Sequence, residues 1–237
     1  RFIFVNFFAL GASFITLLPV LKQFTSLSSI PKLQNIYDNP SGALIKAVLM
    51  NGAQFLKGVD NGSNGVTEIK PYDNNQNFGR LALQHSLYLP GKTDVQLNVL
   101  SDRKTVEDQR SRKEVIKIDK SDGCAYEKLS VTLIWVEPGS SPGCTKCVLN
   151  DLDLSVELGG ITHYPNNLGR PDRHNNAERV IISGVNHGDE ATITVEGYNL
   201  MQNEQQYSLV ATGCFGGVAN QMFANDCSVF DCDESES

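Results

Sequence analysis

The sequence predicts a mainly β protein, in which an antiparallel β-sandwich, most simply a jelly roll, follows a shorter helical part. Two observations predict this fold class. From residue 92 onward, apolar residues alternate with polar ones in roughly seven or eight short segments, separated by clusters of Gly, Pro, Asn or Asp, without a helical pattern between them. Before residue 92, apolar residues instead recur with mostly three- and four-residue spacing over residues 41–56, which is typical of an amphipathic helix.

The chain of 237 residues is expected to divide into four parts. They are an apolar segment with a loop (1–38), a helical part (39–91), the sandwich (92–214) and an acidic tail that contains cysteines (215–237). In the helical part, Ser41 or Asn39 is suited to cap a helix over residues 41–56, and a second, short helix is expected over residues 79–89. The Gly, Asn and Asp residues between the two predict a loop.

The predicted strands of the sandwich follow one another at short intervals. They cover residues 95–100, 114–118, 129–136, 148–158, 179–183, 191–198 and 207–212. Trp135, the only tryptophan of the chain, ends an apolar strand, so we expect it in the core or at the sandwich edge. A platform for a carbohydrate or a peptide is the alternative for this residue.

The N-terminal apolar run, residues 2–21, has about the length that spans a bilayer. Three interpretations stay open: a membrane anchor, a buried helix whose partners lie upstream, and a signal segment. Asn6 and Pro19 weaken the anchor. Because the chain starts at Arg1 rather than Met, we expect a longer parent. The expected location is extracellular, by secretion, or membrane-anchored through residues 2–21.

Charge and cysteine content narrow the class of protein. A net charge of −7 without a Lys/Arg cluster argues against nucleic acid as a partner and disfavours an anionic membrane surface.

The six cysteines are Cys124, Cys144, Cys147, Cys214, Cys227 and Cys232. An even number suits the disulfides of an extracellular module. Cys144 and Cys147 also have the spacing of half a zinc site or of a redox pair, although a second pair of zinc ligands is missing.

Several motifs together resemble a known family. Residues 39–53, NPSGALIKAVLMNGA, resemble the helix that follows the catalytic-serine helix of subtilisin-like serine proteases, and residues 75–81, NQNFGRL, resemble the signature that closes that catalytic domain. The strongest match is to the C-terminal β-sandwich of the alkaline, oxidatively stable subtilisin-like proteases. It is carried, in order and spacing, by residues 133–135, 148–154, 175–180 and 191–199. The resemblance extends over residues 39–212.

The resemblance implies a serine endopeptidase, in which a serine attacks the peptide carbonyl, a histidine moves the proton, an aspartate orients the histidine and an asparagine holds the oxyanion. In the family these groups precede the helix that begins near Ser41. The four histidines here are His85, His163, His174 and His187, all of which follow it. Ser13, in Gly-Ala-Ser, only echoes the nucleophile motif. We therefore expect no catalytic residue in this chain and a C-terminal fragment that is inactive alone.

The partner implied is the catalytic domain of the parent protease, with a protein or peptide substrate only in the intact parent. There the sandwich would pack on the catalytic domain and stabilise it. The helices before the sandwich would lack most of the sheet on which the family packs them. We therefore expect residues 1–89 to be poorly ordered or aggregation-prone. Two rival functions stay open: a non-catalytic jelly-roll module that binds carbohydrate or protein through Trp135 and loop 166–176, and a membrane-anchored pseudoprotease.

A calcium site is expected in the sandwich. Strand alternation places Asp151 and Asp153 together on the face opposite Leu152 and Leu154. Two such carboxylates repel each other, whereas calcium binds six to eight oxygen ligands in irregular geometry. The next long loop supplies further oxygens from Asp172, Asn175, Asn176 and Glu178. We therefore predict calcium as the cofactor, with Asp151, Asp153, Asp172 and Glu178 as ligands, as the resemblance also implies. Solvated acids on an exposed strand face are the alternative.

Overall fold

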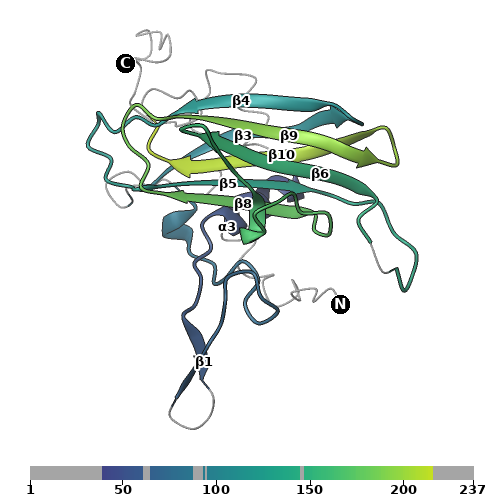
Figure 1. Cartoon of the computed structure of the whole chain (residues 1–237), viewed down its shortest axis with the longest axis horizontal. Helices are drawn as coiled ribbons and strands as arrows, with labels where there is room; N and C mark the ends of the chain where they lie inside the picture. Colours follow the sequence, from purple (N-terminus) through teal and green to yellow (C-terminus); the bar gives the residue numbers. More distant parts are fainter. Residues whose placement is uncertain (1–38, 61–64, 88–92, 94, 145–146, 216–237) are drawn as a thin grey trace. The chain divides into compact units, whose positions relative to one another are not determined.

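The computed structural model describes residues 39–60, 65–87, 93, 95–144 and 147–215 (Figure 1). The predicted apolar run, Ser13 and the acidic tail beyond residue 215 lie outside the described residues, as do Cys227 and Cys232. The described elements are one α-helix, ten strands and two short 3-10 turns, η2 (Leu83–His85) and η3 (Pro165–Asn167).

Eight of the strands form two antiparallel four-stranded sheets. The first sheet contains, in this order, β3 (Gln96–Glu107), β10 (Glu204–Gly213), β5 (Lys128–Trp135) and β8 (Ala177–Ser183). The second contains β4 (Ser111–Lys117), β9 (Glu190–Leu200), β6 (Asn150–Leu158) and β7 (Ile161–His163). A separate hairpin pairs β1 (Gly58–Asp60) with β2 (Val66–Glu68). The predicted mainly β class is confirmed, and the two sheets are compatible with a β-sandwich.

Alternate residues of both sheets form one hydrophobic core. On β5 and β6, the side chains of Val131, Leu133, Leu152 and Leu154 are fully buried in it. Successive side chains of a strand point to opposite faces, so the apolar alternation in the sequence directs every second residue inward. Each such burial stabilises the fold by about 1.5–3 kcal/mol, and a shift of one residue in register would lose it along the whole strand.

Trp135 belongs to this core, as predicted. It is 1% exposed, and its indole N–H donates to the carbonyl oxygen of Asn150 at 2.8 Å. The Glu137 carboxylate also accepts from the indole, and it accepts from the backbone N–H of Leu149 at 2.9 Å. With no exposed ring face, Trp135 cannot serve as a platform for a carbohydrate or a peptide, and that alternative is wrong.

Helix α3 (Gly42–Asn51) begins where the sequence predicts and ends five residues earlier than expected. The hydroxyl of Ser41 accepts from the N–H of Leu44 at 2.9 Å, which is the N-cap contact that the sequence indicates. Gly52 forms the C-cap of the helix and packs closely against another segment, where a Cβ would lie 2.2 Å from the Ser86 hydroxyl oxygen. Only glycine tolerates that approach. Beyond it the chain is extended and Gln54 bridges to Arg80.

The second predicted helix, over residues 79–89, is wrong for the described residues. In its place Arg80 pairs with Gln54, and only the 3-10 turn η2 follows. Gly79 has φ of +94° and lies so close to the carbonyl group of Gln54 that a Cβ would approach its oxygen to 2.3 Å. Both conditions exclude a helical start at this glycine.

Helix α3 packs on β5 and β10 of the first sheet (Figure 1). Leu44, Ala47 and Val48 are buried there. From the resemblance we expected this segment to lack most of the surface on which it packs. For the described residues that expectation is wrong, since the sandwich itself supplies a surface on which the helix rests.

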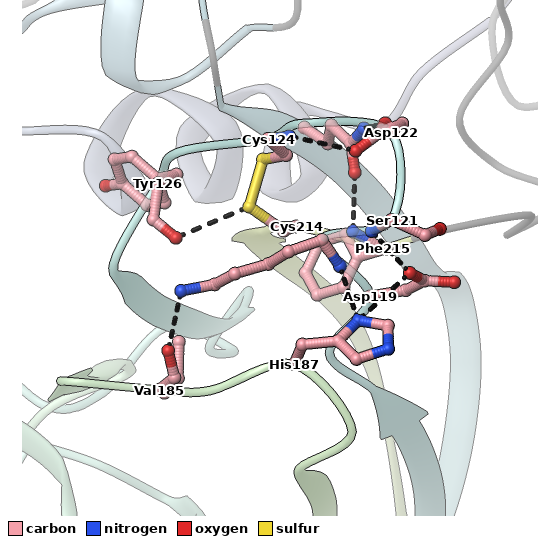
Figure 2. The surroundings of a disulfide bond; sticks show 11 residues. Asp119, Ser121, Asp122, Cys124, Tyr126, Val185, His187, Cys214 and Phe215 are labelled. Carbon is pink, nitrogen blue, oxygen red and sulfur yellow. Dashed lines mark hydrogen bonds and ion pairs between the residues drawn. A yellow bond between two sulfur atoms is a disulfide. The ribbon is translucent and has the colours of Figure 1, made fainter.

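Two disulfides confirm the disulfide-bearing class. Cys124 and Cys214 are bonded at 2.05 Å across 90 residues of sequence, which ties the segment before β5 to the end of β10 (Figure 2). Cys144 and Cys147 are bonded to each other, so within the described part of the chain their sulfurs are not placed as two ligands of a zinc ion. Disulfides persist in oxidising compartments, which favours a location outside the cytosol.

The described residues contain no helix that is both long enough and apolar enough to cross a membrane.

Candidate functional site

The structure brings together the four acids that the sequence predicts as metal ligands. Asp151 and Asp153 lie on β6, Glu178 on β8, and Asp172 in the loop before β8. We call these four residues the acidic cluster. All four are buried, with at most 6% of each residue exposed. The predicted alternative, solvated acids on an exposed strand face, is therefore wrong.

Glu178 reaches the acidic cluster from the first sheet. It pairs with Leu133 in the β5–β8 register, and both residues are fully buried. One carboxylate oxygen, Oε2, accepts from the backbone N–H of Leu154 at 2.6 Å. That N–H is available because β7 pairs with β6 only from Val156 onward. The other oxygen, Oε1, has no hydrogen-bond partner among the described residues.

The charge state of Glu178 reflects this burial. Desolvation raises the pKa of its carboxyl well above the usual value, and the charges of Asp153, Asp172 and Asp151 raise it further. The N–H of Leu154 acts in the opposite direction but does not outweigh burial. An ionised Glu178 is thus costly here unless a cation lies close to it.

Asp153 has the guanidinium of Arg173 as its cationic neighbour. Arg173 forms an ion pair with Asp153 Oδ2 and lies 3.8 Å from Asp151 Oδ1. Its guanidinium also covers the ring of Tyr198, 3.3 Å from the ring centre. Burial raises the pKa of Asp153 to about 6 although Arg173 lowers it. Asp153 Oδ1 has no hydrogen-bond partner in the described part of the chain.

Asp172 is enclosed by amide donors. Its carboxylate accepts from the side-chain amides of Asn166 and Asn175, both at 2.7 Å, and from the backbone N–H of His174 at 3.0 Å. Asn166, which has a positive φ of 55°, also donates to the Ala177 carbonyl oxygen. These contacts shape the loop before β8. Asn175 lies next to the acidic cluster, but it presents its side-chain N–H to Asp172 rather than the oxygen that the sequence predicts for a metal.

Asn176, which the sequence predicts as a further oxygen donor to the metal, instead donates its side-chain N–H to the carbonyl oxygen of Trp135 at 3.2 Å.

The acidic cluster has the donor chemistry of a calcium site, but the oxygens do not converge on one point. Within the described residues, no group of three His, Cys, Asp or Glu side chains is arranged to hold a metal ion. The structure instead places Arg173 against two of the acids. Asp153 Oδ1 and Glu178 Oε1 are the buried acceptors that a hard cation would satisfy.

A second feature, which the sequence did not indicate, is the contact between the sandwich and the segment around α3. Arg179 of β8 is 1% exposed and donates to the carbonyl oxygens of Met50, Ala53 and Phe78 at 2.6, 2.9 and 3.1 Å. It also donates to the Tyr72 hydroxyl at 3.1 Å. The rings of Phe55, Tyr72 and Phe78 surround its guanidinium. Arg179 therefore connects the C-terminal end of α3 to residues of the following loop.

The N-terminal end of α3 is held from β3. Asp102 accepts from the backbone N–H of Ser41 at 3.1 Å and from its hydroxyl, and also from the hydroxyl of Ser208 at 2.8 Å. The helix dipole is stabilised by a negative charge near the N-terminus of the helix and by a positive charge near its C-terminus. Asp102 and Arg179 thus complement the two ends of α3 from within the sandwich.

Between these ends, Asn51 joins α3 to the face of the first sheet. Its amide donates to the Thr212 hydroxyl at 2.9 Å, and its carbonyl oxygen accepts from Ser130 and Thr132 at 2.9 and 2.8 Å. All four residues are buried. In the sequence such polar residues on outward strand positions are typical of a solvated face, so nothing marked them as an interface.

The four histidines lie in different parts of the fold: His85 in η2, His163 in β7, His174 before β8 and His187 after it. His187 lies in the surroundings of the Cys124–Cys214 disulfide, where its Nδ1 accepts from the N–H of Lys120 at 3.0 Å and lies 3.3 Å from an Asp119 oxygen (Figure 2). Its side chain is 58% exposed, which suits a loop contact at the surface rather than a catalytic base.

Comparison with known proteins links the chain to a protease by name. No protein-family model matches it. The chain is 23% identical over 238 residues to the curated "Serine protease/ABC transporter B family protein tagB" of Dictyostelium discoideum. The similarity covers 82% of this chain and 12% of that protein. The chain therefore spans about an eighth of that relative's length, and the similarity indicates a protease-related sequence.

Proposed function

We propose that this chain is the C-terminal part of a subtilisin-like serine endopeptidase, in which a jelly-roll sandwich holds the end of the catalytic domain. The serine protease in the relative's name and the ordered motifs of residues 39–212 support the family. The strand order supports the jelly roll: the first and last strands, β3 and β10, are neighbours, and β3 and β4 fall in different sheets.

The observation that carries this proposal is the attachment of α3 at both ends. The motif of residues 39–53 belongs, by resemblance, to the catalytic domain, and Asp102 and Arg179 belong to the sandwich. The sandwich thus provides the buried charges that the helix needs at its termini. Its role in the parent is to stabilise the helix that follows the catalytic-serine helix.

Peptide hydrolysis in this proposal belongs to the intact parent. In the family the serine, histidine and aspartate precede the helix that begins near Ser41, whereas all four histidines of this chain follow it, so we expect the 237-residue chain to be inactive alone. A protein or peptide substrate is cleaved outside the cytosol, consistent with the Cys124–Cys214 disulfide.

A fluorophosphonate probe, which labels activated serines, tests the activity. We expect labelling of the full-length gene product and none of the 237-residue chain. Full-length protein that is not labelled would overturn the protease assignment. Labelling of the 237-residue chain would instead show that it carries a nucleophile of its own.

We also propose calcium as a structural cofactor of the acidic cluster. Support comes from two buried oxygens without a hydrogen-bond donor in the described part of the chain, Asp153 Oδ1 and Glu178 Oε1. Asp151, Asp153 and Glu178 would supply ligands, and Asp172 would lie nearby with its amide donors. When bound, calcium supplies positive charge to a buried group of carboxylates, which stabilises the fold.

Calorimetric melting with calcium and with a chelator tests this cofactor. We expect a higher melting temperature in calcium for the wild type and no response in the Asp153→Asn variant. An equal melting temperature in calcium and chelator would remove the calcium proposal and leave the protease proposal intact.

A further inference from the structure

We propose that the Cys144–Cys147 disulfide is a site of thiol–disulfide exchange, which small thiols of the glutathione class reduce while the Cys124–Cys214 disulfide stays intact. Both bonds are present in the structure. The sequence left a redox pair open for Cys144 and Cys147, and neither the protease function nor the calcium site uses these residues. Failure of the exchange would therefore leave both of those functions unaffected.

The two disulfides contribute unequally to the fold. The Cys124–Cys214 bond spans 90 residues of sequence and ties the segment before β5 to the end of β10 (Figure 2). The Cys144–Cys147 bond spans three residues within the loop between β5 and β6. Because the stabilisation from a disulfide grows with the length of the chain segment that it closes, the shorter bond contributes less. Reduction of Cys144–Cys147 therefore removes less folding free energy than reduction of Cys124–Cys214.

The surroundings of the two bonds also differ. Cys144 and Cys147 are both partly exposed, and the three residues before Cys144 are exposed. Cys124 is partly exposed as well, but its partner Cys214 is 0% exposed and belongs to the hydrophobic core. Attack on Cys124 would thus release a thiolate into an apolar interior, which is costly, whereas attack on the loop bond would not. In the folded protein, a thiol reduces the loop bond first.

Neighbouring atoms distinguish the two sulfurs of the loop bond. The Ser140 hydroxyl oxygen lies 3.4 Å from Cys144 Sγ, and since a disulfide sulfur carries no proton, the hydroxyl is the donor. Cys147 Sγ lies instead 3.2 Å from the carbonyl oxygen of Cys144, whose negative end disfavours a thiolate at Cys147. Ser140 stabilises a thiolate at Cys144, which makes Cys144 the leaving group and Cys147 Sγ the sulfur that is attacked.

The exchange takes place in two steps. The thiolate of a first small thiol attacks Cys147 Sγ and forms a mixed disulfide, while the Sγ–Sγ bond breaks and its electron pair stays on Cys144 Sγ. The thiolate of a second small thiol then attacks the sulfur of the first, which releases the small disulfide and the thiolate of Cys147. Two small thiols are oxidised, the protein disulfide is reduced by two electrons, and the two protons that the small thiols lost end on Cys144 and Cys147.

Reduction leaves the sandwich folded, because other contacts close the same loop. The Glu137 carboxylate accepts from the backbone N–H groups of Leu149 and Asn150 at 2.9 and 3.1 Å, and from the indole of Trp135. These contacts join the end of β5 to the start of β6 without either cysteine. The pair therefore passes between disulfide and dithiol while Trp135 stays buried.

Incubation of the 237-residue chain in mixtures of reduced and oxidised glutathione tests the exchange. Free thiols are then alkylated and located by peptide mass spectrometry. We expect alkylation of Cys144 and Cys147 in mixtures in which Cys124 and Cys214 stay protected, with the fluorescence of Trp135 unchanged. Reduction of both disulfides together, a change in Trp135 fluorescence as the loop bond reacts, or a loop bond that survives the most reducing mixture would each overturn the proposal.

Two serine variants test which sulfur leaves. We expect Ser140→Ala to be reduced by glutathione about three- to tenfold more slowly than the wild type, because the leaving thiolate loses a hydrogen bond. Ser141→Ala, at the exposed neighbouring position, is the matched control and should react at the wild-type rate. A mixed disulfide trapped by rapid acidification should carry glutathione on Cys147. Equal rates for the wild type and Ser140→Ala, or glutathione trapped on Cys144, would overturn the assignment of Cys144 as the leaving group.

Discussion

Replacement of Arg179 by Met tests the attachment of α3 most severely. The substitution keeps the aliphatic stem but removes donors to three carbonyl oxygens, those of Met50, Ala53 and Phe78, and to the Tyr72 hydroxyl. A buried acceptor that loses its donor costs about 1–3 kcal/mol. Local relaxation favours the lower limit for each, and the lost contact with three aromatic rings adds to it. We expect a loss of about 3–5 kcal/mol in the free energy of unfolding.

Urea unfolding monitored by the fluorescence of Trp135, the only tryptophan, measures this loss, because Trp135 is buried in the sandwich core. Arg179→Lys keeps the charge with fewer donors and should lose about half as much. Arg110→Met, at an exposed position, is the matched control and should change stability by less than about 0.5 kcal/mol. A loss of less than about 1 kcal/mol for Arg179→Met would refute this role.

Three further changes test other parts of the structure. Asp102→Asn removes the charge that faces the N-terminus of α3 and should cost about 1 kcal/mol in urea unfolding; an unchanged midpoint would contradict the capping role. Replacing Cys124 and Cys214 by Ser opens a link across 90 residues and should lower the free energy of unfolding by about 4–5 kcal/mol in the same assay. A double variant as stable as the wild type would contradict this expectation. In chelator at neutral pH, Glu178→Gln should melt at a higher temperature than the wild type, because burial and the neighbouring acids raise the pKa of the Glu178 carboxyl, which costs folding stability above the pKa of the unfolded chain. A lower melting temperature would show that the carboxyl group is stabilising.

The strands were predictable because their signal is local. Alternation on β5 and β6 reports which side chains face the core, and the structure buries Val131, Leu133, Leu152 and Leu154 accordingly. The start of α3 was predictable for the same reason, since Ser41 caps the helix three residues upstream of its hydrogen-bond donor.

The end of α3 was not predictable from local sequence, because the helix stops where Gly52 packs against Ser86, a residue 34 positions further along the chain.

The acidic cluster was predictable in part. Alternation grouped Asp151 with Asp153, and Asp172 lies in the loop as expected, whereas Glu178, expected in the same loop, lies on β8 of the first sheet. Their burial depends on how the loop before β8 folds over β6, which no local pattern encodes. Arg173 was missed because a single arginine in a polar loop is typical of a solvated surface.

Arg179 and Asp102 were missed for a related reason. Both lie in strands, where a charged residue next to a buried one is the ordinary pattern of a sheet with one solvated face. Only the position of α3 on that sheet converts them into buried partners. Neither residue is recognisable as a buried partner until the position of α3 is known.

The most direct test of the proposed role is the thermal half-life of fluorophosphonate labelling in the full-length gene product, with and without Arg179→Met. We predict that the wild type is labelled, and that the variant loses its capacity for labelling several-fold faster on heating, because the helix after the catalytic-serine helix is no longer held. Equal half-lives for the two proteins would contradict the claim that the sandwich stabilises a protease domain.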